Sequence, residues 1–368
     1  MQYYLEKNVL EAALDRIRWI YDEFDEVMIS SSGGKDSTVC FHLALQVARE
    51  KNRLPVNLLF IDQEAEWQST IDYQKTLMYR DDVKPYWMQI HMKMFNSANF
   101  HEGFRELWKP GEKWLREKDP IAIKENTYGT QRFGDLFNRI VRKEFEGKSA
   151  CSIGGVRCEE SPNRRTALTH CAKYKGETWG AYLNIEEKKY TFYPIYDWSY
   201  KDVWAYIAKN NLPYNKIYDA QYAYGLPVLK MRVSNLHHET AIKSLIHASE
   251  LEPETWNKLQ EFVVGSNSIK QLPDTINCPN KLPFMFKDWR EYRDFLLEKL
   301  VEPQFKSKFA NKFKLMDAKY ERYEQINDVY RAQIGAILRN DIYFTGLLNF
   351  EGTGKIKEFR REKRRRIC

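Results

Sequence analysis

The hydrophobic and polar positions in the first 155 residues alternate between short apolar runs and amphipathic stretches. The apolar runs of strand length are 26–31, 55–61, 85–92 and 149–155. The stretches with helical spacing are 6–22, 37–50, 66–80 and 132–146. Strands that alternate with helices indicate βαβ units and a parallel sheet. We therefore predict an α/β fold built on a doubly wound, mostly parallel sheet.

The same pattern predicts three parts of the chain. Residues 1–237 form the α/β domain, and residues 95–148 within it are a long insertion between the third and fourth strands. Residues 238–354 carry further helical patterns and form a helical accessory region. Residues 355–368 form a basic tail, and it is the only low-complexity stretch in the sequence.

Composition places the chain among soluble globular proteins. Hydrophobic residues make up 43% of the 368 residues and charged residues 30%, which is enough apolar material for a core. Apolar runs stay well short of a membrane span, and the N-terminal stretch carries charges throughout, so we expect neither a membrane span nor a signal peptide. Six cysteines without a regular framework indicate reduced thiols, and we therefore expect a cytoplasmic protein.

The formal charge of +7 is concentrated in the tail. The stretch "KIKEFRREKRRR", residues 355–366, holds eight basic and two acidic residues and contributes +6 of that charge. Such a run favours binding of a polyanion such as nucleic acid, or it is a solvated chain end.

One stretch, "VMISSSGGKDSTVC" (27–40), places a glycine-rich turn between an apolar run and a helical stretch. Such a turn presents backbone N–H groups to an anion, and the helix N-terminus adds partial positive charge. The spacing is neither that of the Walker pattern nor that of the dinucleotide fingerprint. It predicts a phosphate-binding turn made by Ser32, Gly33, Gly34, Lys35, Asp36 and Ser37.

Adjacent glycines followed by Lys-Asp-Ser resemble the SGGxDS signature of the PP-loop ATP pyrophosphatases. The resemblance implies that the turn binds ATP or a related adenine nucleotide and that the chain cleaves ATP between the α and β phosphates. In this setting Lys35 would neutralise a phosphate. Asp36 would hold Mg²⁺ or orient the turn, and Ser37 would cap the helix and donate to a phosphate.

Asp62, in "LFIDQEAEW", follows the second apolar run. Ligands of open α/β sheets lie beyond the carboxyl ends of the strands, where an acidic residue can bind ribose or Mg²⁺. A helix cap is the alternative role for Asp62.

Two later stretches resemble the phosphoadenosine-phosphosulfate (PAPS) reductase family. They are "SIGGVRCEESPNRR" (152–165), which fits G-x-R-x-x-E-S, and "YPIYDWSYKDVWAYIAKNNLPYNKIYD" (193–219). The resemblance implies that Gly155, Arg157 and Arg164 lie at phosphate or sulfate oxygens, since arginine forks suit these groups. It also makes Arg157 a catalytic residue together with Lys35 and Asp36.

Other residues of the stretch 193–219 are expected to have structural roles. Helical spacing in "DVWAYI" places Val203, Trp204 and Ile207 in the core. Asp197 either caps that helix or lies near the nucleotide.

The cysteines depart from the reductase pattern. Reductases of this family use a nucleophilic cysteine near the C-terminus, and this chain has no Cys-Cys or Cys-x-x-Cys pair and no cysteine between Cys171 and Cys278. Cys368 is the final residue and lacks the motif. We expect no iron–sulfur cluster, and we interpret Cys151 and Cys158 as buried thiols rather than metal ligands.

The segment after residue 238 resembles the accessory region of one branch of the family, which includes proteins similar to the immunoglobulin-binding regulator A and is often accompanied by a ParB-like protein. The leading hypothesis is an ATP pyrophosphatase or adenylyl transferase with an unknown acceptor. One alternative is a sulfonucleotide reductase. The other is a nucleotide-sensing regulator without turnover, and the basic tail and a ParB-like partner would support this regulatory role.

Overall fold

The computed structural model describes residues 6–95, 104–233, 236, 242–262, 278–279, 281–351, 356 and 359. The chain divides into two compact units. The first unit consists of Met1–Met94, Glu106–Leu236 and Ala248–Lys258. The second consists of Phe95–Arg105, His237–His247 and Leu259–Cys368.

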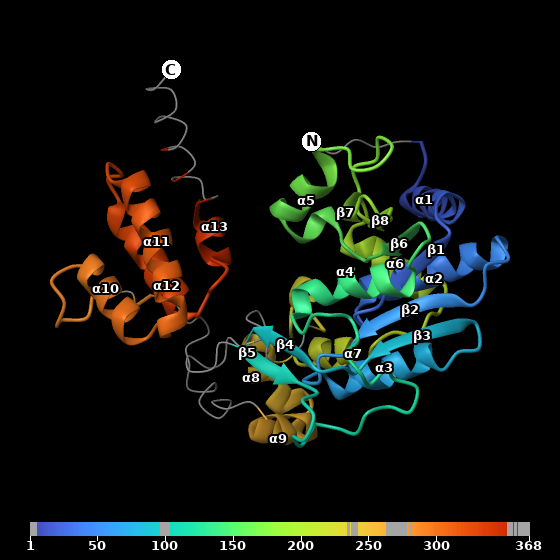
Figure 1. Cartoon of the computed structure of the whole chain (residues 1–368), viewed down its shortest axis with the longest axis horizontal. Helices are drawn as coiled ribbons and strands as arrows, with labels where there is room; N and C mark the ends of the chain where they lie inside the picture. Colours follow the sequence, from blue (N-terminus) through green and yellow to red (C-terminus); the bar gives the residue numbers. More distant parts are fainter. Residues whose placement is uncertain are drawn as a thin grey trace. The chain divides into compact units, whose positions relative to one another are not determined.

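The first unit is built on a six-stranded sheet with the strand order β3-β2-β1-β6-β8-β7 (Figure 1). The strands are β1 Glu26–Ser30, β2 Val56–Ile61, β3 Val83–Met88, β6 Ala150–Ile153, β7 Gly180–Asn184 and β8 Lys189–Phe192. Neighbouring strands pair in parallel from β3 to β8, and β7 is antiparallel to β8. The predicted α/β class with a mostly parallel sheet is therefore confirmed. A separate two-stranded sheet joins β4 Met92–Phe95 and β5 Phe104–Leu107.

Helices precede or follow most strands of the first unit. They are α1 Val9–Glu23, α2 Lys35–Glu50, α3 Gln68–Met78, α4 Phe133–Glu144, α5 Pro162–Thr169, α6 Tyr200–Lys209 and α7 Ile217–Ala223, with the 3-10 turns η1 Cys158–Glu160 and η2 Val228–Lys230. Side-chain caps determine where two of these helices begin. The Asn8 side chain accepts a hydrogen bond from the backbone N–H of the third residue of α1, and Ser199 forms a capping box with Asp202 at the start of α6. The sheet core contains Ile29, Leu58 and Ile153, all fully buried.

The strand order reverses at β1. The chain proceeds from β1 to β2 and β3 on one side, and it returns to place β6 and β8 on the other side. The carboxyl ends of β1 and β6 therefore flank a topological switch point, where open α/β sheets bind their ligands.

Strands β7 and β8 were not expected from the sequence. Each has only four or five residues, and a short polar turn connects them. Such short runs lack the length that identifies a strand by periodicity, and their antiparallel pairing at the sheet edge stabilises them instead.

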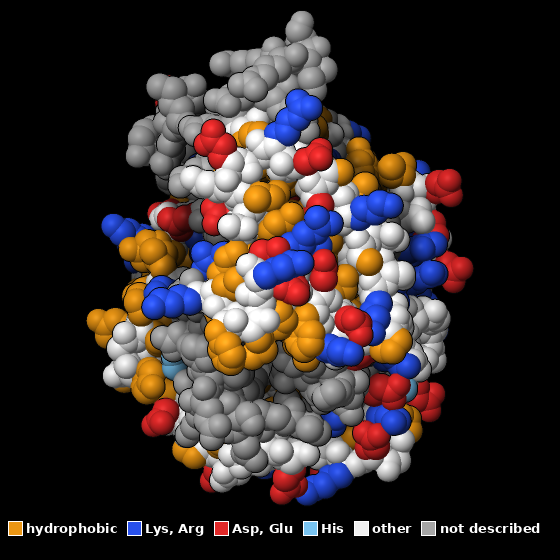
Figure 2. All heavy atoms as spheres, turned by 90° about the vertical axis from the view of Figure 1, so that its left-hand side faces the viewer, with side chains coloured by type: hydrophobic (Ala, Val, Ile, Leu, Met, Phe, Trp, Pro, Cys, Tyr) orange, Lys and Arg blue, Asp and Glu red, His pale blue; other side chains and the backbone are white. Residues whose placement is uncertain are grey.

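The C-terminal third is helical, as predicted. Its helices are α8 Ile242–Leu251, α9 Pro253–Phe262, α10 Trp289–Lys299, α11 Pro303–Tyr320, α12 Ile326–Leu338 and α13 Thr345–Glu351. The core of the second unit includes Phe309, Phe313 and Tyr320 of α11. Within it the buried Arg293 donates to Asp317 at 2.8 Å and to Gln333 at 2.7 Å, so its charge is paired. On the face drawn in Figure 2, basic and acidic side chains are interspersed.

Two expectations concern membranes and the tail. In the part of the chain that the structure describes, no helix combines the length and the apolar character needed to cross a membrane. The basic stretch 355–366 and Cys368 lie outside the described residues, apart from Ile356 and Phe359.

Candidate active site at the switch point

The turn between β1 and α2 is shaped by Gly33. Its backbone has φ +75°, a left-handed conformation that glycine adopts without strain. A Cβ atom at this position would lie 2.7 Å from the methyl group of Thr70. The carbonyl of Gly33 accepts from the buried side chain of Asn215 at 3.2 Å. The asparagine of the "LPYN" motif thus holds the turn from a distant part of the sequence.

Three backbone N–H groups of the turn have only long hydrogen bonds. Ser32 N donates to Ser37 Oγ at 3.3 Å, Gly33 N to Ser31 Oγ at 3.4 Å and Gly34 N to Ser32 Oγ at 3.4 Å. Bonds of this length lie beyond the usual range for N–H donors. An anion in the turn can replace these hydroxyl partners at little cost, so the turn can present amides to phosphate oxygens. Ser32 and Gly34 line the pocket described below, whereas Gly33 does not.

Ser37 lies in the first turn of α2 and is not its cap. The N-cap residue is Gly34, which has no side chain to accept a hydrogen bond. The Ser37 hydroxyl donates to the Gly34 carbonyl at 2.9 Å. The expected capping role was therefore wrong, because the helix begins two residues earlier than position 37.

Lys35, Asp36 and Arg157 form one charged network. The Asp36 carboxylate accepts from Lys35 Nζ at 2.9 Å and from Arg157 Nε at 2.6 Å. Arg157 is 4% exposed, and its Nη1 also donates to Glu159 at 2.7 Å. Asp36 thus fixes both cations beside the turn.

Gly155 brings the loop after β6 against the start of α2. A Cβ atom there would lie 2.7 Å from the carbonyl carbon of Asp36 and 2.8 Å from Ser37 N. These are backbone atoms, so a side chain cannot be accommodated without moving the turn. This close approach explains why Arg157 reaches Asp36.

The turn and this loop line a pocket of about 670 Å³. Its polar wall contains most of the site residues predicted from the sequence, namely Ser32, Gly34, Lys35, Asp36, Ser37, Gly155, Arg157 and Arg164. Its apolar wall contains Leu59, Phe60, Ile61, Phe133, Phe137, Val156, Val228, Leu229, Met231 and Val233. A pocket with an apolar wall opposite a phosphate turn suits a nucleotide, whose base and phosphates have these two characters.

Asp62 does not belong to this lining, contrary to the expectation of a ribose or Mg²⁺ contact. Its side chain is fully buried and accepts from Trp87 Nε1 at 3.0 Å and from Gln89 Nε2 at 2.9 Å. It also forms an ion pair with Arg116 and accepts from Glu64 N at 2.9 Å. With both oxygens occupied in this way, Asp62 attaches residues of the 95–148 insertion to the end of β2.

Several lining residues were not predicted as site residues. Tyr218 accepts a hydrogen bond from Lys35 N at 3.1 Å, and burial raises the pKa of its phenol, so it stays protonated. Arg232 lines the same pocket, as does Tyr200 at the start of α6. The "IYD" motif around Tyr218 could have indicated its place in the site, whereas no sequence motif around Arg232 indicates that it lines the pocket.

Other expectations placed residues away from the pocket. Asp197 is neither a cap nor a pocket residue, because its carboxylate pairs with Arg16 of α1 at 2.6 and 2.9 Å. Trp204 packs against the core and contacts the rings of Tyr214 and Tyr218. The five described cysteines, Cys40, Cys151, Cys158, Cys171 and Cys278, are free and lie outside the pocket lining.

The residues near the turn do not by themselves fit a resident metal ion. Both oxygens of Asp36 already contact cations, and among the described residues there is no group of three or more His, Cys, Asp and Glu side chains that could hold a metal. Mg²⁺ commonly binds through one or two carboxylates together with substrate phosphates, so any Mg²⁺ here would arrive with its nucleotide.

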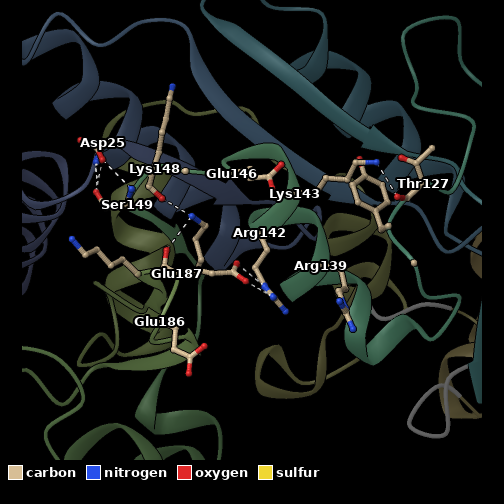
Figure 3. Close-up of a pocket in the computed structure, with 15 residues that line it drawn as sticks. Asp25, Thr127, Arg139, Arg142, Lys143, Glu146, Lys148, Ser149, Glu186 and Glu187 are labelled. Carbon is tan, nitrogen blue, oxygen red and sulfur yellow. Dashed lines mark hydrogen bonds and ion pairs between the residues drawn. The ribbon is translucent and has the colours of Figure 1, made fainter.

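A second pocket, of about 820 Å³, lies at the opposite edge of the sheet, where the parallel strands begin (Figure 3). Several of its charged side chains contact one another or the backbone. Arg142 pairs with Glu187 at 2.8 Å, and Asp25 accepts from the Ser149 hydroxyl at 2.7 Å. The buried Lys189 donates to the carbonyls of Phe145, Lys148 and Glu187.

The fold and the turn define an α/β protein of the PP-loop type, with its pocket at the switch point. Residues 26–224, more than half of the chain, match the phosphoadenosine phosphosulfate reductase domain, and the chain belongs to that family. Residues 225–344 match a domain of unknown function, DUF3440.

Several known proteins are similar to this chain. The uncharacterized protein YbdN of Escherichia coli is 28% identical over 98% of this chain and 95% of its own length. An adenosine 5′-phosphosulfate reductase of Geobacillus thermodenitrificans is 27% identical over 58% of this chain and 77% of its own length. A phosphoadenylyl-sulfate reductase structure from Candida auris covers 62% of this chain and 89% of its own, with 15% identity and a TM-score of 0.35.

Proposed function

We propose that this protein binds ATP in the switch-point pocket and transfers its adenylyl group to an acceptor. The acceptor oxygen or nitrogen attacks the α-phosphorus, the bond from that phosphorus to the bridging oxygen breaks, and pyrophosphate leaves. The proton of the acceptor passes to solvent or to the leaving phosphate. One observation carries the proposal: three turn amides with only long hydrogen bonds lie beside Lys35 at the switch point.

Each part of the site has a role in such a step. The turn amides and Lys35 stabilise the charge that develops on the phosphate oxygens. Arg157, which is fixed by Asp36 and Glu159, adds positive charge without a large reorganisation. The apolar wall with Phe133 and Phe137 accommodates the base and excludes water.

The family relationship favours a second candidate, reduction of a sulfonucleotide, because the Geobacillus relative is named an adenosine 5′-phosphosulfate reductase. That reaction needs a thiolate beside the nucleotide. The described cysteines lie outside the pocket lining, and burial raises the pKa of the nearby Cys158 thiol, so it disfavours the reactive form. We therefore rank reduction below adenylyl transfer.

The resemblance to the branch of the immunoglobulin-binding regulator A adds a regulatory proposal. In it a ParB-like protein is the partner, and the tail 355–366 binds nucleic acid through its eight basic residues. Deletion of residues 355–368 should then reduce retention of DNA at low salt and leave ATP binding intact. Equal retention by the truncated and full chains across a salt series would reject the role of the tail.

Product analysis distinguishes the two enzymatic candidates. The protein is incubated with ATP and Mg²⁺, with and without candidate acceptors, and separately with PAPS and thioredoxin. Adenylyl transfer predicts release of pyrophosphate from ATP that is lost in Lys35→Ala. Release of sulfite from PAPS, abolished in Cys368→Ser, would instead establish the reductase.

A further inference from the structure

The loop between β2 and α3 forms part of the switch-point pocket. Gln63 and Glu66 of this loop line the pocket together with residues of the phosphate turn. The loop leads into α3, where the methyl group of Thr70 lies 2.7 Å from the position that a Cβ of Gly33 would take. The Thr70 hydroxyl accepts from the Asn215 side chain at 2.8 Å, and the same amide donates to the Gly33 carbonyl. A shift of α3 would therefore move the contacts that shape the turn.

The first turn of α3 is capped by a residue from a distant part of the chain. Its own N-cap residue, Trp67, makes no side-chain cap. Instead the Glu252 carboxylate, between α8 and α9, accepts from Gln68 N at 2.7 Å, from Ser69 N at 3.0 Å and from the Ser69 hydroxyl at 2.5 Å. Such a carboxylate satisfies N–H groups that a helix start leaves without partners, and the helix dipole favours its negative charge. Glu252 thus holds the start of α3.

Glu252 lies outside the part of the chain that matches the reductase family. That match ends at residue 224, and residues 225–344 match the domain of unknown function. A second residue of this later part, Leu236, is fully buried, and its backbone N–H donates to the Ala65 carbonyl at 2.9 Å. The loop that lines the pocket is therefore held in its middle by Leu236 and at its end by Glu252.

Glu252 is itself fixed within a short segment of the first unit. Residues 248–258 belong to this unit, whereas the residues before and after them, 237–247 and 259–368, belong to the second unit. Ala248 and Trp256 are buried, and the backbone of Glu252 bonds to both, at 3.0 and 2.9 Å. The Glu252 carboxylate also accepts from the Thr255 hydroxyl at 2.8 Å. A change in the conformation of this segment would therefore displace the carboxylate from α3.

We propose that Glu252 is a positioning residue of the nucleotide pocket, which acts through α3 on the phosphate turn and couples the conformation of residues 248–258 to nucleotide binding. The inference rests on the proposed binding of ATP in this pocket, and it adds a means of regulation to that site. Coupling of this kind is reciprocal, so the contact of Glu252 with α3 favours nucleotide binding and bound nucleotide favours the contact. The domain of unknown function then contributes directly to nucleotide affinity.

Calorimetry with ATP and Mg²⁺ on the full chain tests the role of Glu252. Glu252→Ala removes the carboxylate, and Glu254→Ala removes the same charge from an exposed position in the first turn of α9. We expect Glu252→Ala to weaken ATP binding about fivefold or more, and Glu254→Ala to change it less than about twofold. Loss of a negative charge by itself favours an anionic ligand, so the expected weakening is opposite in sign to a purely electrostatic effect.

A merely structural role of Glu252 gives a different result. Glu252→Ala then lowers the urea midpoint of unfolding but binds ATP like the wild type at a temperature where both proteins are fully folded. Unchanged or tighter ATP binding in the folded variant would overturn the inference. Glu252→Gln keeps the shape and one acceptor oxygen, and it takes the place of Glu252→Ala in the comparison if that variant does not fold.

Hydrogen–deuterium exchange distinguishes failure of this inference from failure of the proposed function. If the wild type binds no ATP, the proposed function fails, and exchange in the protein without nucleotide still decides the role of Glu252. Faster exchange in residues 31–38 as well as 68–70 of Glu252→Ala supports an action through α3 on the turn. Faster exchange confined to residues 68–70, or no change in either segment, overturns it.

Discussion

The six-stranded sheet carries one charged pocket at the amino-terminal ends of its strands and another at their carboxyl-terminal ends. The charges are arranged differently in these two pockets. At the edge where the strands begin, Lys189 donates to three backbone carbonyls and Arg142 pairs with Glu187. At the carboxyl-terminal ends, the amides of Ser32, Gly33 and Gly34 have only bonds of 3.3 to 3.4 Å. The two pockets are of comparable volume, about 820 and 670 Å³.

Size and the number of charged residues therefore do not identify the site. What distinguishes the switch-point pocket is hydrogen-bonding capacity that the fold leaves available. Buried polar groups are normally satisfied within the protein, so donors that are held in place with poor partners indicate a ligand. At the amino-terminal ends of the strands, Lys189 and Arg142 use their donors to hold β8 and the turn before it against the end of α4.

The largest expected effect follows from Gly155→Ala. The new Cβ would overlap the backbone of Asp36 and Ser37, which must move and take the turn with them. We expect no detectable ATP binding by calorimetry. Gly134→Ala on α4 is the control, because its Cβ meets open space. Wild-type affinity in Gly155→Ala would show that the turn is not the phosphate site.

Next in size is the effect of Lys35→Ala on ATP affinity. Loss of a charged contact to phosphate costs about 1.5–3 kcal/mol, which corresponds to roughly 10- to 150-fold weaker binding. Lys143→Ala at the other edge removes the same side chain from the pocket of Figure 3 and should leave ATP affinity unchanged. A larger loss in Lys143→Ala than in Lys35→Ala would reverse the assignment of the two edges.

Lys189→Met should act on stability and not on binding. Removal of the ammonium leaves the carbonyls of Phe145, Lys148 and Glu187 without the hydrogen bonds that Lys189 donates. This loss lowers the free energy of unfolding by on the order of 1–3 kcal/mol. Urea unfolding measures this cost, with the exposed Lys188→Met as control. Loss of ATP binding at unchanged stability would instead make this edge functional.

The last expected effect is a pH dependence from His42 of α2, which is absent near pH 7 and grows only as the pH falls. Burial, assisted by the charges of Arg80 and Arg49, lowers the pKa of His42 to about 4. The unfolded chain takes up this proton near pH 6.5, whereas the folded chain resists it. Stability should therefore fall as pH drops from about 6.5 towards 4, and His42→Gln should flatten this fall. An identical pH profile of urea unfolding in His42→Gln would reject this assignment.

Local patterns predicted much of the fold and the centre of the site. The turn from Ser32 to Ser37 and its flanking strand and helix are contiguous, so spacing and residue type were sufficient. The second loop, with Gly155 and Arg157, could be added because its motif resembles that of the reductase family. The short strands β7 and β8 were not predicted, because they are stabilised by pairing with each other and show no clear periodicity in the sequence.

Residues whose roles depend on distant partners could not be assigned from the sequence. Asp62 looked like a ligand at a strand end, but Trp87 and Arg116 occupy its carboxylate. Arg232 carries no local motif, and only the fold places it in the lining of the switch-point pocket. For Asp62 the deciding contacts join residues that are 25 and 54 positions apart in the chain.

Hydrogen–deuterium exchange with and without ATP and Mg²⁺ tests the central claim most directly, because it reports both edges of the sheet in one measurement. We predict that ATP slows exchange of the backbone amides in residues 31–38 and 154–160, which bound phosphates would engage or cover. Exchange in residues 139–149 and 186–189 should not change. Protection confined to these latter segments, with none in the turn, would contradict the account.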